Sequence, residues 1–149
     1  MKRTNRQSET RGVALILVVF AIAFVSALVA VVLEVATTDL AILRNHTSGL
    51  KAMYAAEAGV AEAIVALRNE YDTTNTLQGT LTAPDGSTCS YYTKIDNAEP
   101  VVTVSSVGRA AGFTRAVQAQ LVVAGPPMEA PYPVRVVWWR EATVKDEGF

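Results

Sequence analysis

The sequence predicts an α+β fold, in which one long N-terminal helix, first membrane-spanning and then amphipathic, packs on a small antiparallel β-sheet. Three observations predict it. Residues 13–33 are almost entirely apolar. Residues 34–68 contain no proline and are rich in alanine, leucine, glutamate and arginine, which favour helix. After residue 79, short runs alternate between apolar and polar residues, as strands with one buried face do.

A polar, basic leader, residues 1–12, meets the apolar run directly after Gly12. The leader carries four Lys/Arg and one Glu, whereas residues 13–33 carry one polar side chain, Ser26. As a helix this run spans ~31 Å, which matches the ~30 Å hydrocarbon core of a bilayer. The run is therefore predicted to be a membrane segment, whose large side chains for contact with lipid or neighbouring helices include Leu15, Leu17, Phe20, Phe24 and Leu28.

The exit of the apolar run differs from that of a cleaved secretory signal. Such a signal has an apolar region of about 7–15 residues and then small residues at the cleavage site. Here the run is longer and Glu34 follows it, so either the anchor is uncleaved or the leader is cut before the run, between Gly12 and Val13. Residues 33–39 carry two acids and no base, so the positive-inside bias predicts a cytoplasmic N-terminus and an external C-terminal domain.

The segment 34–68 is predicted to continue the helix with one apolar stripe. The stripe runs at helical spacing, and the part expected to pack on the sheet consists of Leu50, Met53, Val60, Ile64 and Leu67. Residues 45–49 have the weakest helix propensity, which predicts a kink or a locally melted turn there. Glu57 falls at a stripe position; either it reaches solvent from the stripe's edge, or it faces the core and pairs with a base such as Arg115.

The sheet is expected within residues 79–149. Residues 71–79 are polar and predict a loop, and residues 84–87 predict a turn. Strands are expected at 89–96, 101–107 and 113–123, with a possible fourth at 134–140 that places Val134, Val136 and Trp138 on one side. In the third strand Arg115 interrupts the apolar face. Four prolines within 126–133 predict an extended connection before the last strand.

Charge and composition exclude several function classes. The net charge of −1 includes the four bases and one acid of residues 1–12, so residues 13–149 carry −4. That balance argues against a nucleic-acid-binding surface. Cys89 is the one cysteine and is expected to be a half-buried strand residue, and His46 is the one histidine. No phosphate-binding, dinucleotide-binding or zinc motif occurs, so the sequence predicts no catalytic residue, no metal site and no cofactor.

These features resemble the type IV pilin superfamily. The segments that carry the resemblance are RGVALILVVF at 11–20, AAEAGVAEA at 55–63 and VSSVGRAAGFTRAVQAQLVV at 104–123. In that family a prepilin peptidase cuts after the glycine on the cytoplasmic side, and the new N-terminus is methylated. The resemblance implies that Gly12 and Val13 form the processing site.

One position departs from the usual pilin pattern. Ordinary pilins carry glutamate at the fifth mature position, where it neutralises the amine of a neighbouring subunit, whereas this chain has Leu17. In this respect the chain is similar to PilX-type minor pilins and to the K-type pseudopilins of type II secretion. The latter usually carry a large helical insertion, for which 149 residues leave no room.

The resemblance implies a minor pilin-like subunit of a type IV pilus or related filament, acting in assembly, in initiation or at the tip, and not an enzyme. Its implied partners are the prepilin peptidase, other minor and major pilins and the bacterial inner membrane. Its headpiece would be periplasmic, and on the cell surface after assembly. Two alternatives are an uncleaved bitopic envelope protein whose sheet domain binds a partner, and a K-type pseudopilin.

Overall fold

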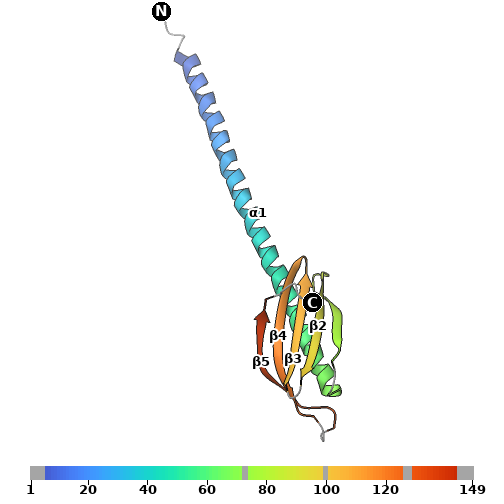
Figure 1. Cartoon of the computed structure of the whole chain (residues 1–149). Coiled ribbons are helices and arrows are strands. Elements are labelled where there is room, and N and C mark those ends of the chain that lie inside the picture. Colours follow the sequence, from blue (N-terminus) through green and yellow to red (C-terminus); the bar gives the residue numbers. More distant parts are fainter. Residues whose placement is uncertain (1–5, 72–73, 99–100, 126–128, 144–149) are drawn as a thin grey trace, which may run out of the picture. The chain divides into compact units, whose positions relative to one another are not determined.

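The chain forms one long helix followed by a five-stranded sheet (Figure 1). The computed structural model describes residues 6–71, 74–98, 101–125 and 129–143. Its elements are α1 (Arg6–Asn69), β1 (Thr76–Thr82), β2 (Thr88–Ala98), β3 (Val101–Ala110), β4 (Phe113–Val123) and β5 (Val134–Ala142). The predicted α+β class, a long N-terminal helix packed on an antiparallel sheet, is confirmed.

The chain divides into two compact units, one ending at Arg44 and one beginning at Asn45, and α1 contributes to both. The first is called the N-terminal unit here and the second the headpiece. Residues 45–49 are helical, so the predicted melted turn is wrong. Ser48 and Gly49 are buried in the headpiece, and this packing outweighs their weak helix propensity.

The sheet is an antiparallel meander in which the strands lie in sequence order, β1-β2-β3-β4-β5. β4 has the predicted bounds, and β3 continues three residues beyond its predicted end, to Ala110. Ala110 pairs with Phe113, which leaves a two-residue turn, Ala111-Gly112. Both turn residues have positive φ, 47° and 83°, the conformation that suits the right-handed twist of a tight hairpin.

β1 was not expected, because residues 71–79 were predicted to be a loop. Its inward side carries only Leu77, Gly79 and Leu81, and the outward side is threonine and glutamine. Gly79 pairs directly with Tyr91 of β2, and a Cβ at Gly79 would collide with the tyrosine ring. The large ring therefore covers a strand position that has no side chain of its own. The overlooked sequence signal is the β-branched threonine at 76, 80 and 82.

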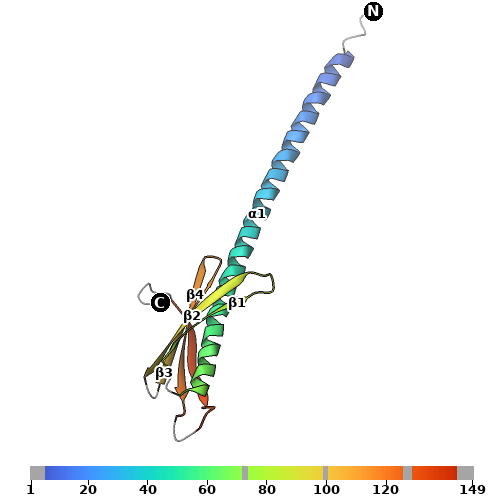
Figure 2. The same cartoon turned by 90° about the vertical axis from the view of Figure 1, so that its right-hand side faces the viewer.

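The second half of α1 lies along one face of the sheet (Figure 2). Its contact face consists of small residues, with the side chains of Ala52, Ala55, Ala56 and Ala63 fully buried. A Cβ at Gly59 would collide with the hydroxyls of Thr93 and Ser106, which are hydrogen-bonded to each other at 2.8 Å. A Cβ at Gly108 of β3 would collide with the backbone of α1 at Ala52 and Ala56. The small residues therefore bring the helix and sheet backbones close together.

Of the five residues predicted to pack on the sheet, Val60 and Leu67 lie in the core, and Met53 and Ile64 are partly exposed against it. Leu50 departs from the prediction, since it is 43% exposed. The sheet packs against the small residues of α1, and Ala52 lies about 200° around the helix from Leu50. The core is completed by apolar residues of β2, β3 and β4, including Ile95, Val104, Val117 and Leu121.

The end of α1 is held by the connection to β5. The backbone amide of Tyr132 donates to the carbonyl of Arg68 at 2.8 Å, which satisfies one of the free carbonyls of the last turn. The rings of Tyr71 and Tyr132 lie 5.6 Å apart. The predicted proline-rich connection, 126–133, falls partly outside the described residues, and its described part supplies this contact.

Two glycines of α1 provide a matched test of the close approach. Gly49→Ala should stabilise the headpiece by about 0.5–1 kcal/mol, because a Cβ there meets only a guanidinium nitrogen of Arg115 at 3.9 Å and alanine favours helix. Gly59→Ala should destabilise it by about 1–3 kcal/mol, because the added methyl overpacks the Thr93–Ser106 pair. Urea unfolding of the full chain in detergent, followed by tryptophan fluorescence, measures both. Equal changes in the free energy of unfolding for the two variants would contradict the close approach of Gly59 to the Thr93–Ser106 pair.

Candidate functional site

The expected processing junction lies inside α1. Gly12 is exposed, and no atom lies within 4 Å of the position that a Cβ would take. Glycine in a helix interior costs about 1 kcal/mol relative to alanine. Within the described part of the chain, nothing requires glycine at this position. Gly12 therefore has no packing role among the described residues, and cleavage between Gly12 and Val13 stays a prediction.

The N-terminal unit exposes its apolar side chains on every side. The helix contains a window of mean hydropathy 3.2 with no buried residue, so it is long and apolar enough to span a membrane. The predicted contact residues are all more than half exposed, with Phe20 at 72% the most exposed among Leu15, Leu17, Phe20, Phe24 and Leu28. These positions are available to lipid or to another helix.

Exposed apolar surface continues past the predicted membrane segment. Val35, Leu40 and Ile42 are each more than half exposed. Between them, the hydroxyls of Thr37 and Thr38 both donate to the carbonyl of Glu34 at 2.9 Å, so their polarity is partly satisfied within the helix. Exposed apolar side chains thus recur from residue 13 to residue 42, over ~45 Å of helix, with the charged side chains of Glu34 and Asp39 among them.

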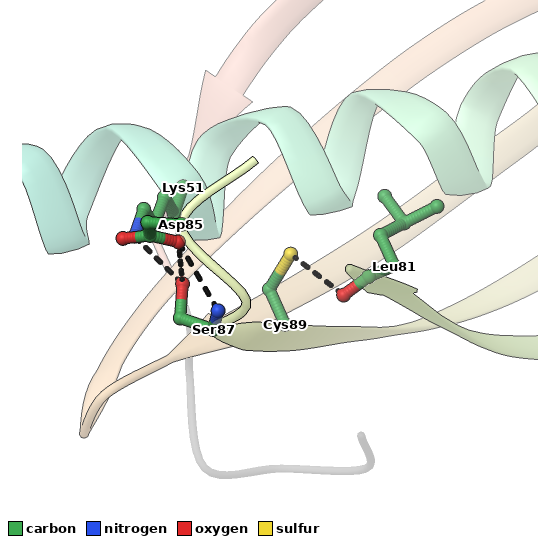
Figure 3. A network of polar contacts seen from close by, with 5 residues as sticks. All are labelled: Lys51, Leu81, Asp85, Ser87 and Cys89. Carbon is green, nitrogen blue, oxygen red and sulfur yellow. Dashed lines mark hydrogen bonds and ion pairs between the residues drawn. The ribbon is translucent and has the colours of Figure 1, made fainter. Parts of the chain in front are cut away.

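In the headpiece, a polar contact joins α1 to the β1–β2 hairpin (Figure 3). The Lys51 ammonium lies 2.5 Å from a carboxylate oxygen of Asp85 and 2.7 Å from the hydroxyl of Ser87. The Ser87 hydroxyl and amide both donate to the other Asp85 oxygen. The hydrogen bond from Lys51, with those from Ser87, holds the pKa of Asp85 well below its usual range. The hairpin is therefore tied to the helix by a solvent-exposed ion pair.

Two further side chains connect β2 to its neighbours. Cys89 is buried, and its thiol donates to the carbonyl of Leu81 at 3.6 Å (Figure 3). Tyr91, which covers Gly79, donates its hydroxyl to the Glu62 carboxylate on α1, and this bond raises the pKa of Tyr91. Arg115 is exposed and pairs with Glu141 at 2.9 Å rather than with Glu57, which is partly exposed.

β5 carries a bulge that changes which tryptophan faces the helix side. Val136 pairs with Leu121 and Trp138 with Gln120, so Val137 has no partner on β4. After this extra residue the alternation reverses, and Trp139, opposite buried Ala119, follows Val136 on the helix side. The prediction that Val134, Val136 and Trp138 share one side is therefore wrong for Trp138.

The described residues bring together no group of three His, Cys, Asp or Glu side chains that could hold a metal ion. His46 is exposed on α1. The uncovered face of the sheet contains a cavity of about 530 Å³, with Val107 and Tyr92 among hydroxyl and amide side chains and Arg109. This lining contains no thiol, carboxylate or imidazole, and so no pair of nucleophile and base.

The chain was also compared with known proteins. It matches no family model, no curated protein and no solved structure.

Acid should weaken the contact between the hairpin and α1. Because the pKa of Asp85 is lower in the folded than in the unfolded chain, its contribution to stability is present above about pH 4 and is lost as the pH falls below that value. Urea midpoints of the full chain in detergent at pH 5 and pH 2.5 measure this. Asp85→Asn should reduce the dependence on pH more than Asp96→Asn, which removes an exposed β2 carboxylate outside this network. Identical pH profiles for the two variants would exclude a contribution from this contact.

Proposed function

We propose that this chain is a minor pilin-like subunit, of the PilX type, of a type IV pilus or related filament. A prepilin peptidase cuts it between Gly12 and Val13. The apolar part of α1 then anchors it in the inner membrane, with the N-terminus cytoplasmic and the headpiece outside. On assembly the same helix packs among those of other minor and major pilins. The proposed role is structural and not enzymatic.

The observation that carries this proposal is the length of exposed apolar helix. A ~30 Å hydrocarbon core accommodates ~39 Å of helix even at a tilt of 40°, the upper end of the usual range. Exposed apolar side chains recur over ~45 Å of helix, residues 13–42, and continue past the charged Glu34 and Asp39. Lipid alone therefore leaves apolar side chains such as Leu40 and Ile42 in water. Neighbouring helices in a filament would cover the whole length.

An apolar helix can exchange lipid for protein at modest net cost. Lipid tails are as apolar as leucine side chains, so helix association in a membrane depends on packing rather than on removal of water. The same surface of α1 therefore suits both a waiting state in the bilayer and an assembled state in a fibre. Gly12, for which the described structure offers no packing role, supports recognition by a peptidase at the start of this surface.

Leu17 supports a low-copy position in the filament. From Gly12 onward, the first carboxylate of the chain is Glu34, far from the new N-terminus. An unpaired amine within an apolar bundle costs several kcal/mol. A subunit that lacks a glutamate at this position leaves the amine of the next subunit unpaired. This cost is absent where no subunit lies ahead of it, which is at the start or tip of a fibre.

Processing is tested by the mass of the membrane-extracted protein. In cells with an active prepilin peptidase, the chain should lack residues 1–12. Gly12→Val should block this loss, because a pocket fitted to glycine has no space for a branched side chain, while Ser26→Val in the same apolar segment should be processed normally. The helix has open space at position 12, so unchanged membrane extraction would separate blocked cleavage from misfolding. Natural protein that still begins at Met1 would favour the uncleaved bitopic alternative.

Filament position is tested by quantitative immunoblots of sheared fibres. The protein should be present at a small fraction of the major pilin, and its deletion should reduce filament number more than filament length. Leu17→Glu should raise its share in the fibres, because the added carboxylate can pair with a neighbouring amine, whereas Leu17→Gln should raise it much less. A natural stoichiometry close to that of the major pilin would rule out the tip or initiating position, and absence from fibres would rule out the filament role.

A further inference from the structure

β5 is an edge strand with an unusual surface. It lies at one end of the sheet order, so its side away from β4 pairs with no described strand (Figure 1). A free edge presents backbone N–H and C=O groups that can pair with another chain. Proteins usually protect such edges with charges, prolines or bulges. The opposite edge, β1, carries only threonine and glutamine on its outward side.

The middle of β5 is apolar, between Arg135 and Arg140. Four consecutive residues, Val136, Val137, Trp138 and Trp139, are exposed large hydrophobics, with Trp139 and Val136 each 50% exposed. No other strand of the headpiece has two consecutive residues of this kind among those described. Because scattered exposed hydrophobics are ordinary but a continuous cluster is not, this edge has the character of an interaction surface.

Two arginines, Arg135 and Arg140, lie on either side of Trp138 on the face of the sheet that α1 does not cover. Arg140 lies over the Trp138 ring, 5.0 Å from its centroid, and donates to the neutral amide of Gln118. Arg135 is exposed and forms no ion pair within the described residues. The only acid of β5, Glu141, faces the other side and pairs with Arg115. The two arginines are thus not matched by any acid on their own face of β4 or β5.

The register of β4 gives the spacing that a partner must match. Arg135 lies opposite Val122, and Arg140 lies opposite Gln118, so the two arginines face positions four residues apart on a neighbouring strand. Side chains four residues apart in a strand point to the same face. A strand added at the free edge would therefore place its residues i and i+4 beside the two arginines. Its residues i+1 and i+3 would point to the opposite face of the sheet, where Val136 and Trp139 lie.

We propose that β5 binds an extended acidic segment of a partner protein as a sixth strand, with carboxylates at i and i+4 beside Arg135 and Arg140 and apolar residues on the opposite face. Strand addition of this kind takes affinity from main-chain hydrogen bonds and specificity from alternate side chains. The inference uses only the headpiece and does not rest on the proposed filament role.

A second copy of β5 is a poorer occupant. Consider a symmetric antiparallel pairing that is centred on Trp138 and leaves the bulged Val137 of each copy unpaired. Arg135 of one copy then lies opposite Arg140 of the other. Like charges that lie directly opposite each other destabilise a strand pair. In this register the same two side chains that favour an acidic partner therefore oppose self-association.

The chain carries a built-in reporter for the test, because its two tryptophans, Trp138 and Trp139, both lie on β5. Full-length protein in detergent is titrated with an end-capped peptide of alternating valine and threonine, in which two threonines four positions apart are replaced by glutamate. We expect a saturable blue shift of tryptophan emission. A peptide with its glutamates three positions apart, on opposite faces, and one with lysine in place of glutamate should each bind roughly fivefold or more weakly, since each loses favourable cross-strand charge pairs.

Protein variants and modified peptides complete the test. Arg135→Glu/Arg140→Glu should weaken binding at least as much as the lysine peptide does, while Lys94→Glu/Arg109→Glu, the same charge change on β2 and β3, should leave it nearly unchanged. N-methylation of alternate peptide amides should abolish binding for the set that faces β5 and preserve it for the other set. Equal binding of all peptides, equal effects of the two double variants, or indifference to N-methylation would each overturn the proposal. A shift with protein concentration alone would also overturn it, in favour of a second copy.

Discussion

The close approach of α1 to β2 and β3 is the constraint on which the headpiece depends. Gly59 on the helix and Gly108 on the sheet leave no room for a Cβ, because the first faces the Thr93–Ser106 pair and the second faces the helix backbone. At this separation, small side chains fill the interface and larger ones lie around it. Interiors are packed as densely as organic crystals, so the position of each larger side chain follows from this contact.

The contact between α1 and the sheet covers only the part of α1 that belongs to the headpiece. In the headpiece one face of the helix is buried in a sheet, and the protein itself satisfies its apolar surface. In the N-terminal unit nothing within the described chain covers the helix, and exposed apolar side chains recur over a length greater than the thickness of a bilayer core. One continuous element therefore combines a face that is buried in the core of the headpiece with an apolar surface that the described chain leaves exposed.

β5 shows how one extra residue redirects a surface. The bulge at Val137 places Trp138 on the face that carries Arg135 and Arg140, and Trp139 on the helix side. Without the bulge the two rings would exchange faces, and Arg140, which lies two residues from Trp138 and therefore on its face, would no longer share a face with Arg135. Bulges are common at sheet edges, where they change the direction of a side chain as this one does.

The sequence by itself determined the class of the fold, the membrane-compatible segment and the strands whose faces alternate, because each of these follows from local hydrophobic period. It did not reveal β1, whose outward side is polar and whose Gly79 depends on Tyr91 across the sheet. Nor did it exclude Leu50 from the interface or place Trp138, since the first depends on how closely small residues let the helix approach and the second on a register shift. Only tertiary structure decides these, because they arise from contacts between residues far apart in the chain.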